Sequence, residues 1–166
     1  MAKVIIGVMG PGEQATPEQA ATAYELGQAI AQAGWVLLTG GRNVGVMEAA
    51  SQGARAEGGL TVGILPGRDA SQMSAAVDIP IFTGIGDARN GINVLSSRVV
   101  VICGAGLGTA AETALALKAQ RPVIFLQPEA QALRFWQSLV ATPLTAVPTV
   151  TAAIAKINQW LSDAEG

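Results

Sequence analysis

The chain has 166 residues, of which 50% are hydrophobic and only 13% charged, and its formal net charge is −2. This length suits a single globular domain over residues 1–166, and the lack of a basic run predicts no nucleic-acid partner. Without histidine, imidazole acid/base chemistry and His-ligated metals are excluded, so no metal site is predicted. The single cysteine, Cys103, favours a reducing, cytoplasmic location, and no apolar run approaches the roughly 20 residues that span a membrane.

Strand-like and helix-like patterns alternate along the chain. Short apolar, β-branched runs predict strands at 4–9, 35–39, 60–65, 79–82, 98–103 and 122–126. Helical spacing predicts helices at 17–33, 44–56, 88–96, 109–119 and 150–161, the first opened by a Thr16–Gln19 capping box. Residues 68–78 are expected to be a loop. The pattern predicts an α/β fold, a doubly wound, mostly parallel, Rossmann-like sheet with helices on both faces.

Three of the predicted strands end in glycine-rich turns. In a parallel sheet these turns lie on one edge, where ligands bind at the point at which strand order reverses. Glycine lets backbone amides approach a ligand, and the following helix directs its N-terminal amides at the same place. One such turn can be a mere tight corner, but together they predict a site for a small phosphorylated ligand. The predicted ligand-binding glycines are Gly10, Gly12, Gly40, Gly41, Gly45, Gly104, Gly106 and Gly108.

The spacing of these glycines differs from that of common nucleotide motifs. The first turn does not spell G-x-G-x-x-G, and Pro11 removes an amide from it. No acidic residue ends the strand at 35–39 to bind a ribose, and the turn after Cys103 lacks the lysine of a P-loop. NAD and ATP are therefore disfavoured.

Several polar residues lie beside the turns. Arg89 is a candidate for binding phosphate, the alternative being a solvated surface arginine, the usual environment of this residue type, and Arg42 is a second candidate. Asp87 is expected to cap the helix at 88–96, and Gly91 within that helix suggests close packing or ligand approach. Glu112 has two interpretations. It completes a local capping box with Thr109, or it holds a carboxylate at the mouth of the site.

Two longer motifs resemble a known family. They are T-G-G-x-x-x-G-V-M-E-A-A at residues 39–50 and G-x-G-x-G-T-x-x-E at residues 104–112. Their order and spacing resemble the Rossmann-like lysine-decarboxylase-like (LOG) superfamily, which includes the cytokinin-activating phosphoribohydrolases. Met47, Asn90 and Thr109, within or beside these motifs, are included among the predicted binding residues.

The resemblance also indicates where this chain departs from the enzymes. They carry a catalytic Arg and Glu, and Arg89 and Glu112 match those positions. Asn90 stands where the enzymes have Lys, and Cys103-Gly104-Ala105 replaces their Pro-Gly-Gly. The short length and the opening I-I-G-V-M-G-P-G look more like the molybdenum cofactor carrier proteins of algae and cyanobacteria.

The resemblance leaves two main hypotheses. A carrier would bind the molybdenum cofactor, a pterin with a terminal phosphate, and would need no catalytic residues. It would form a homodimer or homotetramer and would deliver the cofactor to molybdoenzymes. The loop at 68–78 could then cover the pterin. Alternatively, a phosphoribohydrolase would cleave a nucleoside 5′-monophosphate with Arg89 and Glu112. A nucleotide-sensing module that binds without turnover is a third possibility.

Overall fold

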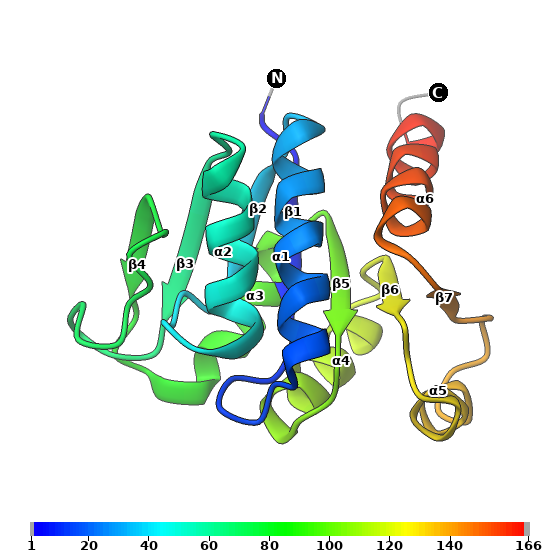
Figure 1. Cartoon of the computed structure of the whole chain (residues 1–166). Helices are drawn as coiled ribbons and strands as arrows, with labels where there is room; N and C mark the ends of the chain where they lie inside the picture. Colours follow the sequence, from blue (N-terminus) through cyan, green and yellow to red (C-terminus); the bar gives the residue numbers. More distant parts are fainter. Residues whose placement is uncertain (1, 165–166) are drawn as a thin grey trace.

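The computed structural model describes residues 2–164, which form one seven-stranded sheet (Figure 1). The strands are β1 (Ile5–Met9), β2 (Val36–Thr39), β3 (Thr61–Leu65), β4 (Ile79–Phe82), β5 (Val99–Cys103), β6 (Val123–Leu126) and β7 (Thr145–Val147). Every pairing is parallel, and the order is β4-β3-β2-β1-β5-β6-β7. The chain runs outward from β1 to β4 and then returns to β5 on the other side of β1. Strand order therefore reverses between β1 and β5.

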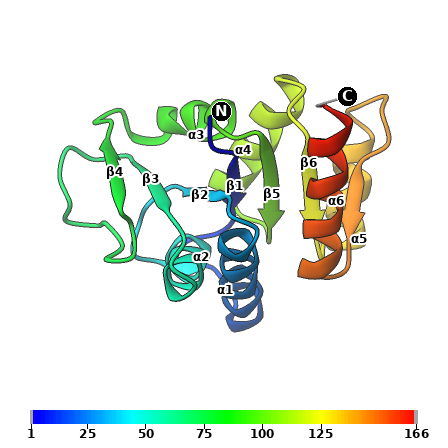
Figure 2. The ribbon, with the colours of Figure 1, turned by 90° about the horizontal axis from the view of Figure 1, so that it is seen from above.

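Helices cover both faces of the sheet. One face carries α1 (Pro17–Gln32), α2 (Gly45–Ala56) and α6 (Val150–Asp163), and the other carries α3 (Asn90–Ser96), α4 (Leu107–Lys118) and α5 (Ala130–Gln137). Figure 2 shows α1 and α2 on the opposite side of the sheet from α3 and α4. In β5, Val99 and Val101 pack toward the first face, while Val100 and Ile102 pack toward the second. This alternation confirms the predicted α/β, doubly wound fold.

Two glycines bring α1 and α2 into unusually close contact. A Cβ atom on Gly53 would lie 2.8 Å from the carbonyl carbon of Tyr24. A Cβ on Gly27 would lie 2.9 Å from the backbone nitrogen of Ala54. Both neighbours are backbone atoms, which cannot rotate away, so the two helices approach each other only because these positions lack side chains.

Most predicted elements are confirmed with bounds shifted by one or two residues. The Thr16–Gln19 capping box is present as predicted, with Thr16 Oγ1 accepting a 3.2 Å hydrogen bond from the Gln19 amide. The patterns did not predict α5 and β7. Both are short: α5 is an amphipathic helix of eight residues, none of them fully buried, and β7 has three residues.

Two predicted helix caps are wrong. α4 begins at Leu107 with Gly106 as its N-cap, in extended backbone at φ −177°, so Thr109 lies inside the helix and forms no capping box with Glu112. The helix starts earlier than predicted because the extended Gly106 already ends the turn. Likewise, Asp87 caps nothing, because a 3₁₀ turn, η1 (Gly86–Arg89), runs directly into α3.

Two further expectations concern Gly91 and the loop at 68–78. No atom lies within 4 Å of a Cβ built on Gly91, so close packing does not explain this glycine. The loop at 68–78 does not cover the pocket described below. It supports the turn after β2 instead, where the Asn43 amide donates to Gln72 O and the Ser74 amide donates to Gly41 O, both at 2.9 Å.

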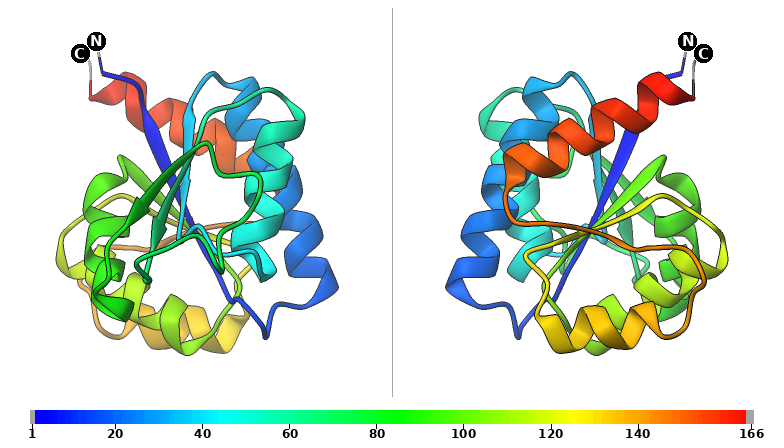
Figure 3. Two further views of the ribbon diagram at one scale, coloured as in Figure 1. Left: turned by 90° about the vertical axis from the view of Figure 1, so that its left-hand side faces the viewer. Right: turned by 90° about the vertical axis from the view of Figure 1, so that its right-hand side faces the viewer.

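The carboxyl ends of the strands lie on the opposite side of the molecule from the start of β1 and the end of α6. Figure 3 shows the end of α6 beside the start of β1, far from the loop between β1 and α1. No helix among residues 2–164 is both long enough and apolar enough to cross a membrane.

Candidate ligand-binding site

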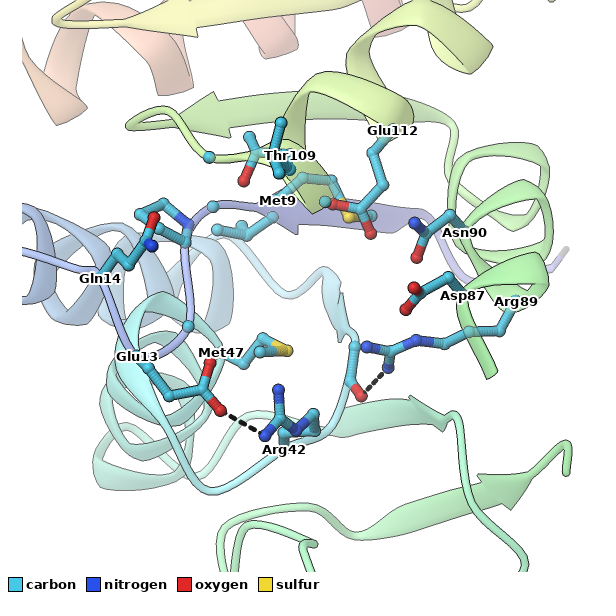
Figure 4. Close-up of a pocket in the computed structure, with 18 residues that line it drawn as sticks. Met9, Glu13, Gln14, Arg42, Met47, Asp87, Arg89, Asn90, Thr109 and Glu112 are labelled. Atoms are coloured by element: carbon cyan, nitrogen blue, oxygen red, sulfur yellow. Dashed lines mark hydrogen bonds and ion pairs between the residues drawn. The ribbon is translucent and has the colours of Figure 1, made fainter. Parts of the chain in front are cut away.

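A pocket of about 310 Å³ opens at the carboxyl ends of β1, β2 and β5, where strand order reverses. Its walls come from the three glycine turns and from the η1–α3 segment (Figure 4). The predicted residues that line it are Gly10, Gly12, Gly40, Arg42, Met47, Arg89, Asn90, Gly106, Gly108, Thr109 and Glu112. The sequence motifs therefore converge on one cavity.

Three predicted glycines do not line this pocket. Gly41, Gly45 and Gly104 have φ values of +74°, +57° and +93°, which side-chain-bearing residues rarely adopt. These glycines shape the turns and do not form the cavity wall. Gly104 lines a smaller cavity of about 150 Å³ on the other side of its turn.

The N-terminus of α4 forms one end of the pocket. No side chain caps this helix, so the amides of its first turn have no side-chain acceptor. Thr109 is only 3% exposed, and its buried Oγ1 has no hydrogen-bond partner among the described residues. Free amides at a helix N-terminus together with an unpaired buried hydroxyl form a site suited to an anion.

Arg89 lies in the wall of the pocket rather than on the surface. Its guanidinium is buried, and Nη1 donates to the carbonyl oxygens of Gly40 and Ile64, which joins the ends of β2 and β3. Burial lowers the pKa of Arg89, and the nearby Glu112 carboxylate opposes that shift. Nη1 of Arg89 therefore holds the backbone around the pocket, while its buried Nε has no hydrogen-bond partner among the described residues.

Glu112 reaches the pocket from α4. Its Oε1 accepts a 2.8 Å hydrogen bond from Asn93 Nδ2. Burial raises the pKa of Glu112 to about 7, against the opposing effects of the Asn93 hydrogen bond and the Arg89 charge. Of the two interpretations of Glu112, the carboxylate at the site agrees with the structure.

Arg42 and Glu13 face each other on the opposite side of the pocket from Thr109 and Glu112 (Figure 4). Arg42 Nη2 lies 2.5 Å from Glu13 Oε1, and this is the single ion pair within residues 2–164. Asp87 and Asn90 lie between these two sides, beside Arg89 (Figure 4). The pocket thus combines two cationic side chains with three carboxyl groups.

Sequence patterns missed several lining residues: Val8, Met9, Pro11, Glu13, Gln14, Asp87 and Leu107. Most belong to the turns already singled out, so taking each turn as a whole would have included them. Asp87 was assigned a capping role, which hid its place in the pocket. Cys103 is a core residue, 2% exposed, and burial raises the pKa of its thiol to about 11.

Among residues 2–164 no cluster of three or more His, Cys, Asp or Glu side chains could hold a metal ion. The arrangement offers hydrogen-bond donors at the N-terminus of α4, acceptors at Asp87 and Glu112, and Arg42 as a second cationic group. Its fold and pocket together define a Rossmann-like protein with a small-molecule site at the topological switch point.

The chain belongs to the SLOG cluster4 family, whose model matches residues 3–154. A protein of Archaeoglobus fulgidus is 46% identical over 123 residues, which cover 74% of this chain and 80% of that protein. A cytokinin riboside 5′-monophosphate phosphoribohydrolase of Mycobacterium marinum is 50% identical, but over only 50 residues, or 30% of this chain and 27% of the enzyme.

Solved structures give longer matches. The molybdenum cofactor binding protein of the phototrophic bacterium Rippkaea orientalis is 55% identical, with a TM-score of 0.95 over 97% of this chain and 99% of that one. The molybdenum cofactor carrier protein of Chlamydomonas reinhardtii is 52% identical, with a TM-score of 0.91 over 97% and 99% of the two chains. The resemblance to LOG proteins, and to the carriers in particular, is therefore confirmed.

Proposed function

We propose that this protein binds the molybdenum cofactor and serves as its storage and carrier protein. The observation that carries the proposal is the match to two such proteins at 52–55% identity over nearly the whole of both chains. The LOG enzyme, in contrast, matches less than a third of either chain. The cofactor is cargo here, a pterin with a terminal phosphate.

The phosphate is assigned to the N-terminus of α4. A buried hydroxyl without a hydrogen-bond partner costs about 1–3 kcal/mol, so Thr109 Oγ1 is poorly accommodated until a ligand accepts from it. The amides of the same helical turn, around Gly108, add donors and a partial positive charge. A phosphate would satisfy both at once.

The remaining pocket residues suit the rest of a pterin. A pterin ring carries N–H donors along its edge, and the carboxyl groups of Asp87 and Glu112 and the amide oxygen of Asn90 are available acceptors. Arg42 supplies positive charge on the opposite side. An anion at the N-terminus of α4 and a donor-rich ring beside Asp87, Asn90 and Glu112 match these groups.

The hydrolytic alternative has weaker support. Arg89 uses Nη1 for two backbone carbonyls, and Asn90 replaces the expected lysine. Glu112, with its raised pKa of about 7, is the one residue that retains the character of an acid/base catalyst. Incubation with AMP tests this alternative, because release of free adenine that disappears in Glu112→Ala would establish hydrolysis and contradict a pure carrier.

The decisive experiment measures saturable binding of freshly released cofactor to the purified protein. Thr109→Val removes the unpaired hydroxyl and should weaken binding about tenfold or more, the usual value of a hydrogen bond to a charged group, without loss of stability. Thr113→Val is the matched control. Thr113 donates a 2.8 Å hydrogen bond to Thr109 O and lies outside the pocket, so its loss should affect stability rather than affinity. No saturable binding by the wild-type protein would refute the proposed function.

The homodimer or homotetramer, the transfer to molybdoenzymes and the cytoplasmic location stay predictions. Exposed apolar residues favour self-association, because Ile92 and Leu95 on α3 are 38% and 56% exposed and Ile85, just before η1, is 50% exposed. Light scattering of wild-type protein and Leu95→Glu measures the oligomeric state. A monomeric wild-type protein would contradict the prediction.

A further inference from the structure

The ion pair between Glu13 and Arg42 joins the β1–α1 loop to the turn after β2, at the side of the pocket. We propose that Glu13 occupies Arg42 in the empty protein as a substitute for an oxyanionic group of the ligand, and that ligand binding displaces it. The inference rests on the proposed function, because it names the partner that Arg42 acquires when the cofactor binds.

Arg42 is the fixed member of the pair. Its backbone forms an isolated antiparallel bridge with Met73, and hydrogen bonds of 2.9 Å on either side tie Gly41 to Ser74 and Asn43 to Gln72. The side chain is only 24% exposed, and its buried Nε has no hydrogen-bond partner among the described residues. The guanidinium is therefore held at the pocket wall with donor capacity to spare.

Glu13 is the exposed member. Its side chain is 66% exposed, and within residues 2–164 it makes a side-chain hydrogen bond to Arg42 alone. That hydrogen bond lowers the pKa of Glu13, so the carboxylate is charged near neutral pH. Rotating an exposed side chain of this kind into water requires no rearrangement of the core.

The charge of Glu13 disfavours a second anion at Arg42 while the ion pair is intact. An oxyanion that approaches Arg42 meets Glu13, a like charge, within contact distance of the same guanidinium. Once Glu13 turns outward, the ligand takes over its hydrogen bond and Arg42 stays paired in both states. A purely supportive Glu13, which only orients Arg42, would have the opposite effect on affinity when it is neutralised.

The oxyanion has two possible sources in this ligand, the terminal phosphate and the oxo-metal group at the other end. We expect the oxo-metal group, because the phosphate is assigned to α4 on the opposite side of the pocket. Two probes separate the sources. One is freshly released molybdenum cofactor, and the other is a fluorescent, metal-free pterin monophosphate.

The test compares wild-type protein with Glu13→Gln, Arg42→Gln and the double variant. Glu13→Gln should bind the complete cofactor about two- to fivefold more tightly, the size of effect expected for an exposed ion pair. The increase should vanish when Arg42→Gln is already present, as a double-mutant cycle requires. Glu25→Gln, an exposed carboxylate on α1 outside the pocket, is the matched control and should leave affinity unchanged.

Each outcome tests the proposed exchange, in which the ligand replaces Glu13 as the partner of Arg42. Tighter binding of the metal-free probe as well would support it and assign the phosphate to Arg42. Unchanged or weaker binding of both probes by Glu13→Gln, or an increase that persists with Arg42→Gln, would overturn it. Wild-type affinity is measured first, so a protein that binds neither probe refutes the proposed function and the exchange together, whereas an intact wild-type affinity isolates the exchange.

Discussion

Asn93 Nδ2 donates a 2.8 Å hydrogen bond to Glu112 Oε1, and this bond joins α3 to α4 at the back of the pocket. Both residues are buried, at 0% and 7% exposure. Because Oε1 is the acceptor for Asn93, the proton of a neutral Glu112 belongs on the other oxygen. The pair thus fixes both the position of the carboxyl group and the atom that titrates.

We expect stability to fall as pH rises through the range in which Glu112 ionises. Its pKa is raised from the usual 4.5 to about 7, so the folded protein binds more protons than the unfolded chain between those values. The stabilisation from neutral Glu112 is complete below the lower value and lost above the higher one, a difference of about 3 kcal/mol. Urea denaturation at about pH 5 and about pH 8 measures it.

Glu112→Gln provides the control for this prediction. Glutamine keeps an acceptor for Asn93 but does not titrate, so the variant should lose most of the pH dependence. Glu25→Gln changes the same formal charge at an exposed site and should keep the wild-type slope. Equal slopes in wild type and Glu112→Gln would show that Glu112 is not the titrating group.

The same substitution at two helical glycines should change stability in opposite directions. Gly53→Ala places a methyl group against the backbone of Tyr24 and should cost about 2–4 kcal/mol, because α1 and α2 must separate. Gly91→Ala on α3 meets open space and should stabilise the protein by about 0.5–1 kcal/mol. Chemical denaturation of both variants measures the difference. A similar loss in both would contradict the close helix contact.

Arg89→Met should destabilise the fold by about 2–4 kcal/mol, because it leaves the buried carbonyls of Gly40 and Ile64 without a donor. Removing the positive charge should also raise the pKa of Glu112 further and shift the pH-dependent loss of stability upward. Arg55→Met is the comparison. Arg55 also donates to a backbone carbonyl, that of Ala75, but it is exposed, so its loss should cost less than about 1 kcal/mol. Equal losses in the two variants would count against a bridging role for Arg89.

Sequence patterns were sufficient for the order of the elements other than α5 and β7, and for the convergence of the three turns. Buried parallel strands are continuous apolar runs, and their carboxyl ends necessarily share an edge, so Gly40 and Gly106 could be placed together without a structure. The start of α4 was mistaken because Thr109 and Glu112 have the spacing of a capping box. The backbone of Gly106, which decides the cap, is not visible in the sequence.

Tertiary partners account for what the patterns missed in the site. Glu13 is an ordinary loop carboxylate until Arg42 is brought to it by the pairing of β1 with β2. Arg89 likewise has no local sign of burial, and only the neighbouring ends of β2 and β3 supply its two acceptors. Contacts across 29 and 49 residues of sequence cannot be inferred from spacing alone.

The close crossing of α1 and α2 limits how the pocket can change shape. The Glu13 loop runs into α1 and the Arg42 turn runs into α2, and Gly27 and Gly53 lock these helices backbone to backbone. Sliding one helix past the other would break contacts that no rotamer can restore. We therefore expect admission of the ligand to depend on side-chain rotation, which takes picoseconds to nanoseconds at exposed sites, rather than on a slow hinge. The backbone of the pocket in such a carrier would therefore have its binding shape before the cofactor binds.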